Sequence, residues 1–284
     1  HHRSNGRAMG RCARGRAKQI PLHANFGMDM EMAIAPSVKK RMRWRALGYG
    51  WAFIGIGLGA AAMLGRGLWC WSFPLFAFVV IPTVELLSRP DASRLTDEEA
   101  WAALQEPLYD VLVYLIVPLQ WTLLVLFLLR VDDPSAAPWE TAGRVATMGL
   151  LCGVYGINVA HELGHRAKRW ERDLARALLL TSLYMHFLVE HNRGHHRHVA
   201  TPMDPASARF GEPIYLFWPR TVVMSFLSAW RIEVEWLRSK GLAPYGPHNE
   251  VLQGLVLEGA LVLTIGLVLG VQVLLYFLMA AFIG

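Results

Sequence analysis

The sequence has little cysteine, and none of it is arranged for metal or redox chemistry. Its three cysteines, Cys12, Cys70 and Cys152, lie far apart and form no CxxC pair. This spacing excludes a disulfide framework and a cysteine-ligated iron or iron–sulfur site. Because Cys70 and Cys152 lie in or beside apolar segments, we expect both to be packing residues. Metal chemistry in this chain therefore depends on other side chains.

Charged residues are also scarce. They make up 18% of the 284 residues against 54% hydrophobic residues, and the mean hydropathy is +0.30. These values argue against one or two soluble domains and predict an all-α integral membrane protein. The apolar segments are 47–64, 68–87, 108–129, 146–160 and 251–284. The last is too long for a single span of roughly 20 residues, so we expect a break near Gly270.

The distribution of basic residues predicts the orientation in the membrane. Eleven of the 28 Lys and Arg residues precede residue 46, and they are densest at 39–45. A basic flank beside the first span stays in the cytoplasm. Residues 88–107 should then be cytoplasmic and residues 131–140 external, and the fourth span should end at the cytoplasmic face. This flank accounts for the net charge of +6 without a nucleic-acid partner.

Both ends of the chain differ from the apolar centre. Residues 1–30 are rich in Gly, Ala and Arg and show no apolar periodicity, so we expect a disordered or non-native arm. Residues 31–284 are then the membrane domain. Because the sequence stops inside an apolar run with no polar flank, we expect this domain to be truncated at its C-terminal side.

Histidine is concentrated in one part of the sequence. Seven of the eleven histidines fall between residues 161 and 198, chiefly in HELGH (161–165) and EHNRGHHRH (190–198). Neutral imidazole is a common ligand of zinc, copper and iron. His161 and His165 are four residues apart and should project from one face of a helix. We expect His191, His195 and His196 to lie in a loop bounded by Gly194 and Thr201-Pro202, where an adjacent pair can serve two neighbouring metals.

Other polar residues beside these motifs are candidates for orienting a metal ligand. Glu162 is also interpretable as a general base or as a solvated charge at the helix end. His198 is also interpretable as facing water, and His186, in an apolar stretch, as a packing residue. The candidates for orienting a ligand are Asn158, Glu162, Glu190, His198 and Asp204.

The sixteen residues 174–189 separate the two histidine motifs and are mostly apolar. If they crossed the membrane, the motifs would lie on opposite faces and could not share a site. A helix of this length reaches roughly 24 Å, which is short of a hydrocarbon core of about 30 Å. We therefore expect this segment to pack against the bundle or to enter and return on one side.

Two stretches carry a family resemblance. HELGHR (161–166), preceded by Asn158, and EHNRGHHRHVATPMDPASAR (190–209) resemble the membrane-bound alkane monooxygenases, which are relatives of the integral-membrane fatty-acid desaturases and hydroxylases. The resemblance covers roughly residues 45–284. It implies a six-helix transmembrane bundle, of which about five and a half spans are present. It also implies a non-haem centre of two iron ions at the cytoplasmic side of a bacterial inner membrane. The iron ligands implied are His161, His165, His191, His195 and His196.

The resemblance also implies an activity. Such an enzyme hydroxylates the terminal methyl group of medium- or long-chain n-alkanes to 1-alkanols, within membrane lipids, using O2 and electrons from rubredoxin and rubredoxin reductase. Arg166, Lys168 and Arg169 are either a docking surface for the acidic carrier or a basic flank of the span. The family's later NYVEHYG-type motif and final HxxxHH-like box do not occur in this sequence. We therefore expect this fragment alone to be inactive.

Three other functions compete with this one. HELGH is also the HExxH motif of zinc proteases, with Glu162 as the base, so an intramembrane protease is an alternative. That interpretation leaves HNRGHH (191–196) unexplained. A membrane fatty-acyl desaturase or lipid hydroxylase shares the histidine motifs. A metal transporter with a His-rich loop would need more acidic and His ligands within the spans than the sequence offers.

Overall fold

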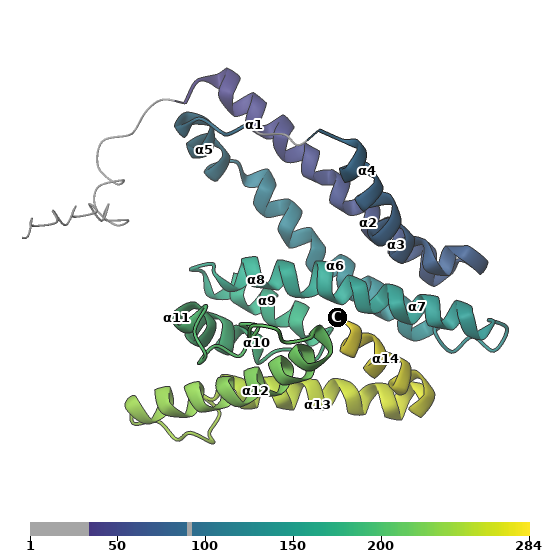
Figure 1. Ribbon diagram of the computed structural model, residues 1–284, viewed down its shortest axis with the longest axis vertical. Coiled ribbons are helices and arrows are strands. Elements are labelled where there is room, and N and C mark those ends of the chain that lie inside the picture. Colours follow the sequence, from purple (N-terminus) through teal and green to yellow (C-terminus); the bar gives the residue numbers. More distant parts are fainter. Residues whose placement is uncertain (1–33, 90–92) are drawn as a thin grey trace, which may run out of the picture.

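The structure is a computed structural model that describes residues 34–89 and 93–284, and all regular structure in these residues is helical (Figure 1). The predicted all-α fold is confirmed. Cys70 and Cys152 are both free and buried, as expected of packing residues. Cys12 and the arm predicted at residues 1–30 lie outside the described residues, so the domain boundary at residue 31 stays a prediction.

The first part of the chain forms two long helical runs, a short helix and a third long helix. The first run covers residues 36–64, a turn at Gly65 and Arg66 follows, and the second run covers residues 67–87. Proline begins α1 and α6, where its missing N–H costs no hydrogen bond. The elements are α1 (Pro36–Gly48), η1 (Tyr49–Trp51), α2 (Ala52–Leu64), η2 (Gly67–Trp71), α3 (Ser72–Leu75), η3 (Phe76–Val80), α4 (Ile81–Leu87), α5 (Asp97–Leu104) and α6 (Pro107–Arg130).

The second part carries both histidine motifs. An unbroken helical run from residue 138 to residue 164 ends in HELGH, and short helices then carry the second motif to a long helix and a final hairpin. The elements are α7 (Pro138–Leu151), η4 (Cys152–Ile157), α8 (Asn158–Gly164), α9 (Arg169–Leu180), α10 (Phe187–Glu190), η5 (His191–His195), α11 (His196–His198), α12 (Ile214–Ser239), α13 (Glu250–Leu269) and α14 (Val271–Ile283).

Four helices in the described residues are long and apolar enough to cross a membrane, namely Pro36–Leu64, Gly67–Leu87, Pro107–Arg130 and Glu250–Leu269. The chain is therefore a multi-pass membrane protein. The fourth predicted span, 146–160, lies inside the run 138–164, which is not among those four. Buried polar residues occur in that run: Arg144 binds the carbonyl oxygens of Gly65 and Arg130, each at 3.0 Å. Helix α14 is apolar but has only 13 residues.

The predicted break near Gly270 is confirmed. Gly270 has φ +92° and ψ 164°, a conformation open to glycine, and it separates α13 from α14. Helix α14 turns back and packs on α7, where Gly149 lies against Ile283. The last helices thus form a hairpin beside the run that carries the first histidine motif (Figure 1).

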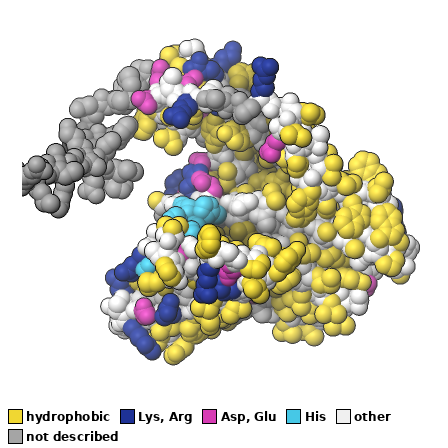
Figure 2. Space-filling view, viewed as in Figure 1, with side chains coloured by type: hydrophobic (Ala, Val, Ile, Leu, Met, Phe, Trp, Pro, Cys, Tyr) yellow, Lys and Arg dark blue, Asp and Glu magenta, His cyan; other side chains and the backbone are white. Residues whose placement is uncertain are grey.

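The histidines lie on the charged part of the surface. Hydrophobic side chains cover most of the right half of the face in Figure 2, and charged side chains gather toward its left, where the histidines lie beside them. In Figure 1 the end of α8 lies at the same end of the bundle as α1 and α5, and the connection from α6 to α7 lies at the other end. This arrangement agrees with the order of spans predicted from charge.

The segment between the two motifs returns to its starting side, as predicted. Helix α9 ends at Leu180, a turn follows, and α10 begins at Phe187. The intramembrane acid Glu258 of α13 accepts a hydrogen bond of 2.7 Å from the backbone N–H of Met185. This carboxylate therefore holds the turn between the motifs against α13.

Candidate metal site

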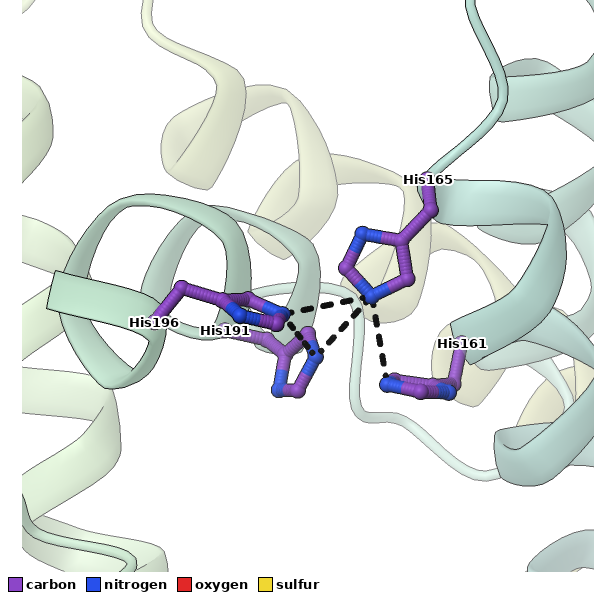
Figure 3. A group of neighbouring side chains, drawn as sticks. All are labelled: His161, His165, His191 and His196. Carbon is purple, nitrogen blue, oxygen red and sulfur yellow. Dashed lines mark hydrogen bonds between the residues drawn. The ribbon is translucent and has the colours of Figure 1, made fainter. Parts of the chain in front are cut away.

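Four imidazole rings converge at the end of α8 (Figure 3). His161 and His165 come from α8 and its C-terminal cap, and His191 and His196 come from η5 and α11. One ligand atom from each residue lies within 4.8 Å of the other three. The structure thus brings together four of the five histidines that the sequence predicts as ligands.

Four of the six distances between the Nε2 atoms suit a single metal ion. His165 Nε2 lies 3.2 Å from that of His161 and 3.3 Å from those of His191 and His196, and the latter two are 3.0 Å apart. Ligands bound at about 2.0–2.1 Å lie roughly 2.8–3.0 Å apart when adjacent in octahedral geometry and roughly 3.3–3.4 Å apart in tetrahedral geometry. Because one ring nitrogen cannot satisfy three others by hydrogen bonding, shared coordination explains this arrangement better.

A π-helical turn determines which rings of the second motif join the cluster. The prediction that His191, His195 and His196 lie in a loop is wrong, because residues 187–198 are helical, with π-type turns over His191–His195. In an α-helix, residues four apart share a face. The wider π turn, with its i→i+5 hydrogen bonds, brings His191 and His196 together instead. The His195 ring stacks on His191 at a centroid distance of 5.2 Å and points elsewhere.

Close packing between α8 and α10 brings the two motifs together. A Cβ on Gly164 would overlap the side chain of Leu188, and the Asn192 amide donates to the carbonyl oxygen of Gly164 at 3.2 Å. Within the second motif, a Cβ on Gly194 would lie 2.5 Å from Glu190 Oε1. Small residues at these two positions therefore allow the helices to approach closely enough for the rings to meet.

An ionic network around Arg193 holds the second motif in place. Arg193 donates to Glu233 of α12, whose side chain is fully buried, and to Glu250 of α13 at 2.9 Å. Glu250 also accepts from Arg176 of α9 at 2.6 Å. The Arg193 guanidinium lies 4.9 Å from the ring centre of Trp236. The network therefore bonds η5 to α12 and α13 and, through Glu250, to α9. These bonds fix the position of η5 and of the histidine rings that it carries.

The cluster favours uncharged imidazoles. Burial, followed by the neighbouring rings of His161 and His196, lowers the pKa of His165. The same causes lower the pKa of His191 to about 3. These rings are therefore neutral at pH 7, with lone pairs available to a metal.

The residues predicted to orient a ligand differ in where they lie. Glu162 is exposed and pairs with Arg166 at 2.9 Å, and Glu190 is buried and accepts from Ser228 at 3.4 Å. Among the described residues, His198 is not part of the group of converging metal-ligand atoms, and Asn158 offers no imidazole to it. Asp204 is buried and contacts His195 Nδ1 at 2.9 Å. Among the described residues, Asp204 is the one of the five whose side chain is hydrogen-bonded to the ring of a predicted ligand.

The residues that hold the second motif were not predicted from the sequence. Arg193 lies inside that motif but was not singled out, and Glu233 and Glu250 lie far from it and belong to no recognisable motif. A weak signal existed, because charged side chains within apolar helices are costly and need partners. Which acid pairs with Arg193 depends on how α12 and α13 fold back, which local sequence does not specify.

Comparison with known proteins identifies relatives. A family model described as "Fatty acid desaturase" matches residues 137–284. The alkane 1-monooxygenase of Acinetobacter baylyi is 36% identical over 74% of this chain and 52% of its own length. That of Pseudomonas putida is 34% identical over 72% of this chain and 47% of its own length. The hydroxylase component of a xylene/toluene monooxygenase from Pseudomonas putida is 32% identical over 54% of this chain and 42% of its own.

The coverage of these relatives is partial. The chain spans about half the length of the curated relatives that it matches. The matched region of the family model contains both histidine motifs and excludes α1–α6.

Replacing Arg193 tests the ionic network. Arg193→Met leaves the buried Glu233 carboxylate without its cation, so we expect a loss of about 3 kcal/mol in unfolding free energy. Arg41→Met removes an ion pair with Glu99 in which the Arg41 side chain is 60% exposed, and it should cost no more than about 1 kcal/mol. Denaturant unfolding in detergent measures both. Equal losses of unfolding free energy in the two variants would contradict a stabilising role of the ionic network.

A matched pair of histidine variants tests the cluster. His196→Ala removes one of the four converging nitrogens, so Co²⁺ should bind at least about 10-fold more weakly, since loss of supporting residues alone has effects of that size. His198→Ala, two residues along the same short helix, should bind Co²⁺ like the unaltered chain. Titration followed by cobalt absorption measures both affinities. Equal weakening in both variants would argue against the cluster as a single site.

The lowered pKa values predict a pH dependence of stability. Between about pH 3, where His191 titrates in the fold, and about pH 6.5, where it titrates when unfolded, the unfolded chain binds more protons. The metal-free chain should therefore lose stability as the pH falls from 7 to 5. Melting temperatures in detergent measure the loss, and His191→Gln should reduce it. Unchanged stability over this range would contradict the prediction.

Proposed function

The chain belongs to the fatty acid desaturase family, and on that premise we propose that the whole protein is a non-haem di-iron monooxygenase that converts n-alkanes to 1-alkanols. The convergence of four imidazoles at one point carries the proposal. His161, His165, His191, His195 and His196 are the iron ligands that this chain contributes. Imidazole donors suit iron, and bound iron supplies the O2 reduction that makes an unactivated C–H bond reactive.

An apolar pocket near the cluster supports the proposal that the substrate is apolar. It has a volume of 440 Å³, and its lining includes Ile157, Leu183, Tyr184, Trp218, Leu278 and Phe282. The ring of Tyr184 stacks on Phe187, and Phe187 stacks on His191 at a centroid distance of 4.8 Å. The pocket is therefore separated from the cluster by one layer of aromatic side chains. An alkane has no polar group, so the shape of such a pocket must orient it.

A basic surface beside the cluster supports an acidic electron donor. A polar pocket of 870 Å³ is lined by Arg166, Arg169, Arg172 and Arg176, and the rings of His165 and His196 also line it. Lys168 lies nearby, over the ring of Trp170. We propose that rubredoxin, reduced by its reductase, docks here, because complementary charge steers association. The basic helix α1 lies at the same end, which favours the cytoplasmic side of the bacterial inner membrane.

The other functions receive less support. An HExxH protease needs Glu162 at the metal, whereas this carboxylate is exposed and pairs with Arg166. The relative named as a xylene/toluene monooxygenase component keeps methylated arenes as a second substrate class. A fatty-acyl desaturase shares the family but would need to bind an acyl carrier or head group.

Product analysis tests the proposed function. The full-length protein in lipid vesicles, with rubredoxin, its reductase and NADH, should convert n-octane to 1-octanol whose oxygen derives from ¹⁸O-labelled O2. His196→Ala should abolish product, and His198→Ala should retain it. Toluene and an acyl thioester serve as competing substrates. Unlabelled alcohol, or an unsaturated acyl product in place of 1-octanol, would contradict the proposal.

A further inference from the structure

His195 differs from the other four predicted ligands. Its ring contacts those of His191 and His196, at centroid distances of 5.2 and 5.9 Å, but its nitrogens are not part of the group formed by the four converging histidines. Its Nδ1 faces Asp204 Oδ2 at 2.9 Å. A ring that donates from Nδ1 to a carboxylate keeps the lone pair on Nε2. His195 therefore presents a ligand atom that the four-histidine site does not use.

Asp204 is held in place by three hydrogen bonds. Its Oδ1 accepts from the backbone N–H of Ala206 at 2.9 Å, and its Oδ2 accepts from Ser207 Oγ at 2.6 Å and from the His195 ring. Its side chain is fully buried, and His195 is its one ion-pair partner among the described residues. A buried carboxylate with such fixed neighbours leaves the imidazole little freedom to turn.

The loop that carries Asp204 is itself fastened to α12. Arg220 donates to the carbonyl oxygens of Pro205 and Ser207 at 3.1 and 3.0 Å, and it forms a two-point pair with Glu212 at 2.6 and 2.8 Å. Thr221 donates to Pro205 at 2.9 Å. The loop is thus bonded to α12 directly after Asp204. Its position follows α12, the same helix that anchors Arg193 through Glu233.

We infer that Asp204 is a positioning residue that holds His195 in the Nδ1–H tautomer, with Nε2 directed at a second metal ion distinct from the one at the four-histidine site. This inference rests on the proposed di-iron function. A carboxylate on the far nitrogen is the usual means of fixing the tautomer and orientation of a metal-binding histidine. In this arrangement the adjacent residues His195 and His196 bind different metal ions.

The first experiment measures the tautomer without any metal. The metal-free chain, labelled with ¹⁵N-histidine in detergent, is compared by NMR with Asp204→Ala, and His195→Gln identifies the signal. We expect His195 to be the Nδ1–H tautomer and to change to Nε2–H in Asp204→Ala. Asp204→Asn keeps an acceptor and should preserve the original tautomer. Asp132→Ala, an exposed acid at the opposite end, is the matched control and should change nothing. An identical His195 tautomer in the unaltered chain and in Asp204→Ala would overturn the positioning role.

The second experiment measures metal in the full-length protein. Asp204→Ala should weaken one of the two metal sites by about 10- to 100-fold and leave the other unchanged. His195→Ala should remove the same site, whereas His196→Ala should remove the other. Equal retention of both metals in Asp204→Ala would overturn the inference. Full-length protein that binds a single metal would contradict the di-iron proposal and the second ion together, whereas a failed tautomer change would contradict the role of Asp204 alone.

Discussion

The structure depends on one constraint: four imidazole nitrogens from two separate motifs must lie within 4.8 Å of one another. The motifs can meet because the apolar segment between them returns without crossing the membrane. The closeness of α8 and α10 at Gly164 and the Arg193 network then set the remaining distances. Without a metal these lone pairs repel, so the surrounding helices must hold them together.

Much of the fold could be predicted from the sequence because it follows from composition and local chemistry. The apolar segments predicted the helices, and Gly270 predicted the hairpin, since glycine tolerates its positive φ. The ring pair of His161 and His165 followed from helical spacing alone. The helical run 138–164 was harder to predict, because polar residues such as Arg144 find buried partners at distant positions in the sequence.

The second motif shows where local sequence is insufficient. HNRGHH does not reveal whether residues four or five apart share a face, and the π turn that decides it packs Gly194 closely against Glu190. The pairing of His195 with Asp204 depends on a loop that Arg220 fastens to α12. Such contacts join parts of the chain whose relative placement only the tertiary fold determines.

The position of the cluster suits the chemistry proposed for it. The apolar pocket of 440 Å³ and the arginine-lined pocket of 870 Å³ have no lining residue in common. In the proposed function, an apolar substrate would occupy the first and an electron donor would dock at the second. Glu258 also has a hydrogen-bond partner, because its carboxylate accepts from the Met185 N–H. This bond positions the turn between the two histidine motifs.

The central claim is that the four histidines bind one metal through their Nε2 atoms. X-ray absorption spectroscopy of the chain loaded with one equivalent of Fe²⁺ or Co²⁺ tests it most directly. We expect a first coordination shell dominated by nitrogen at about 2.0–2.2 Å, with the outer-shell scattering of several imidazole rings. A first shell made mainly of oxygen, without imidazole scattering, would contradict it.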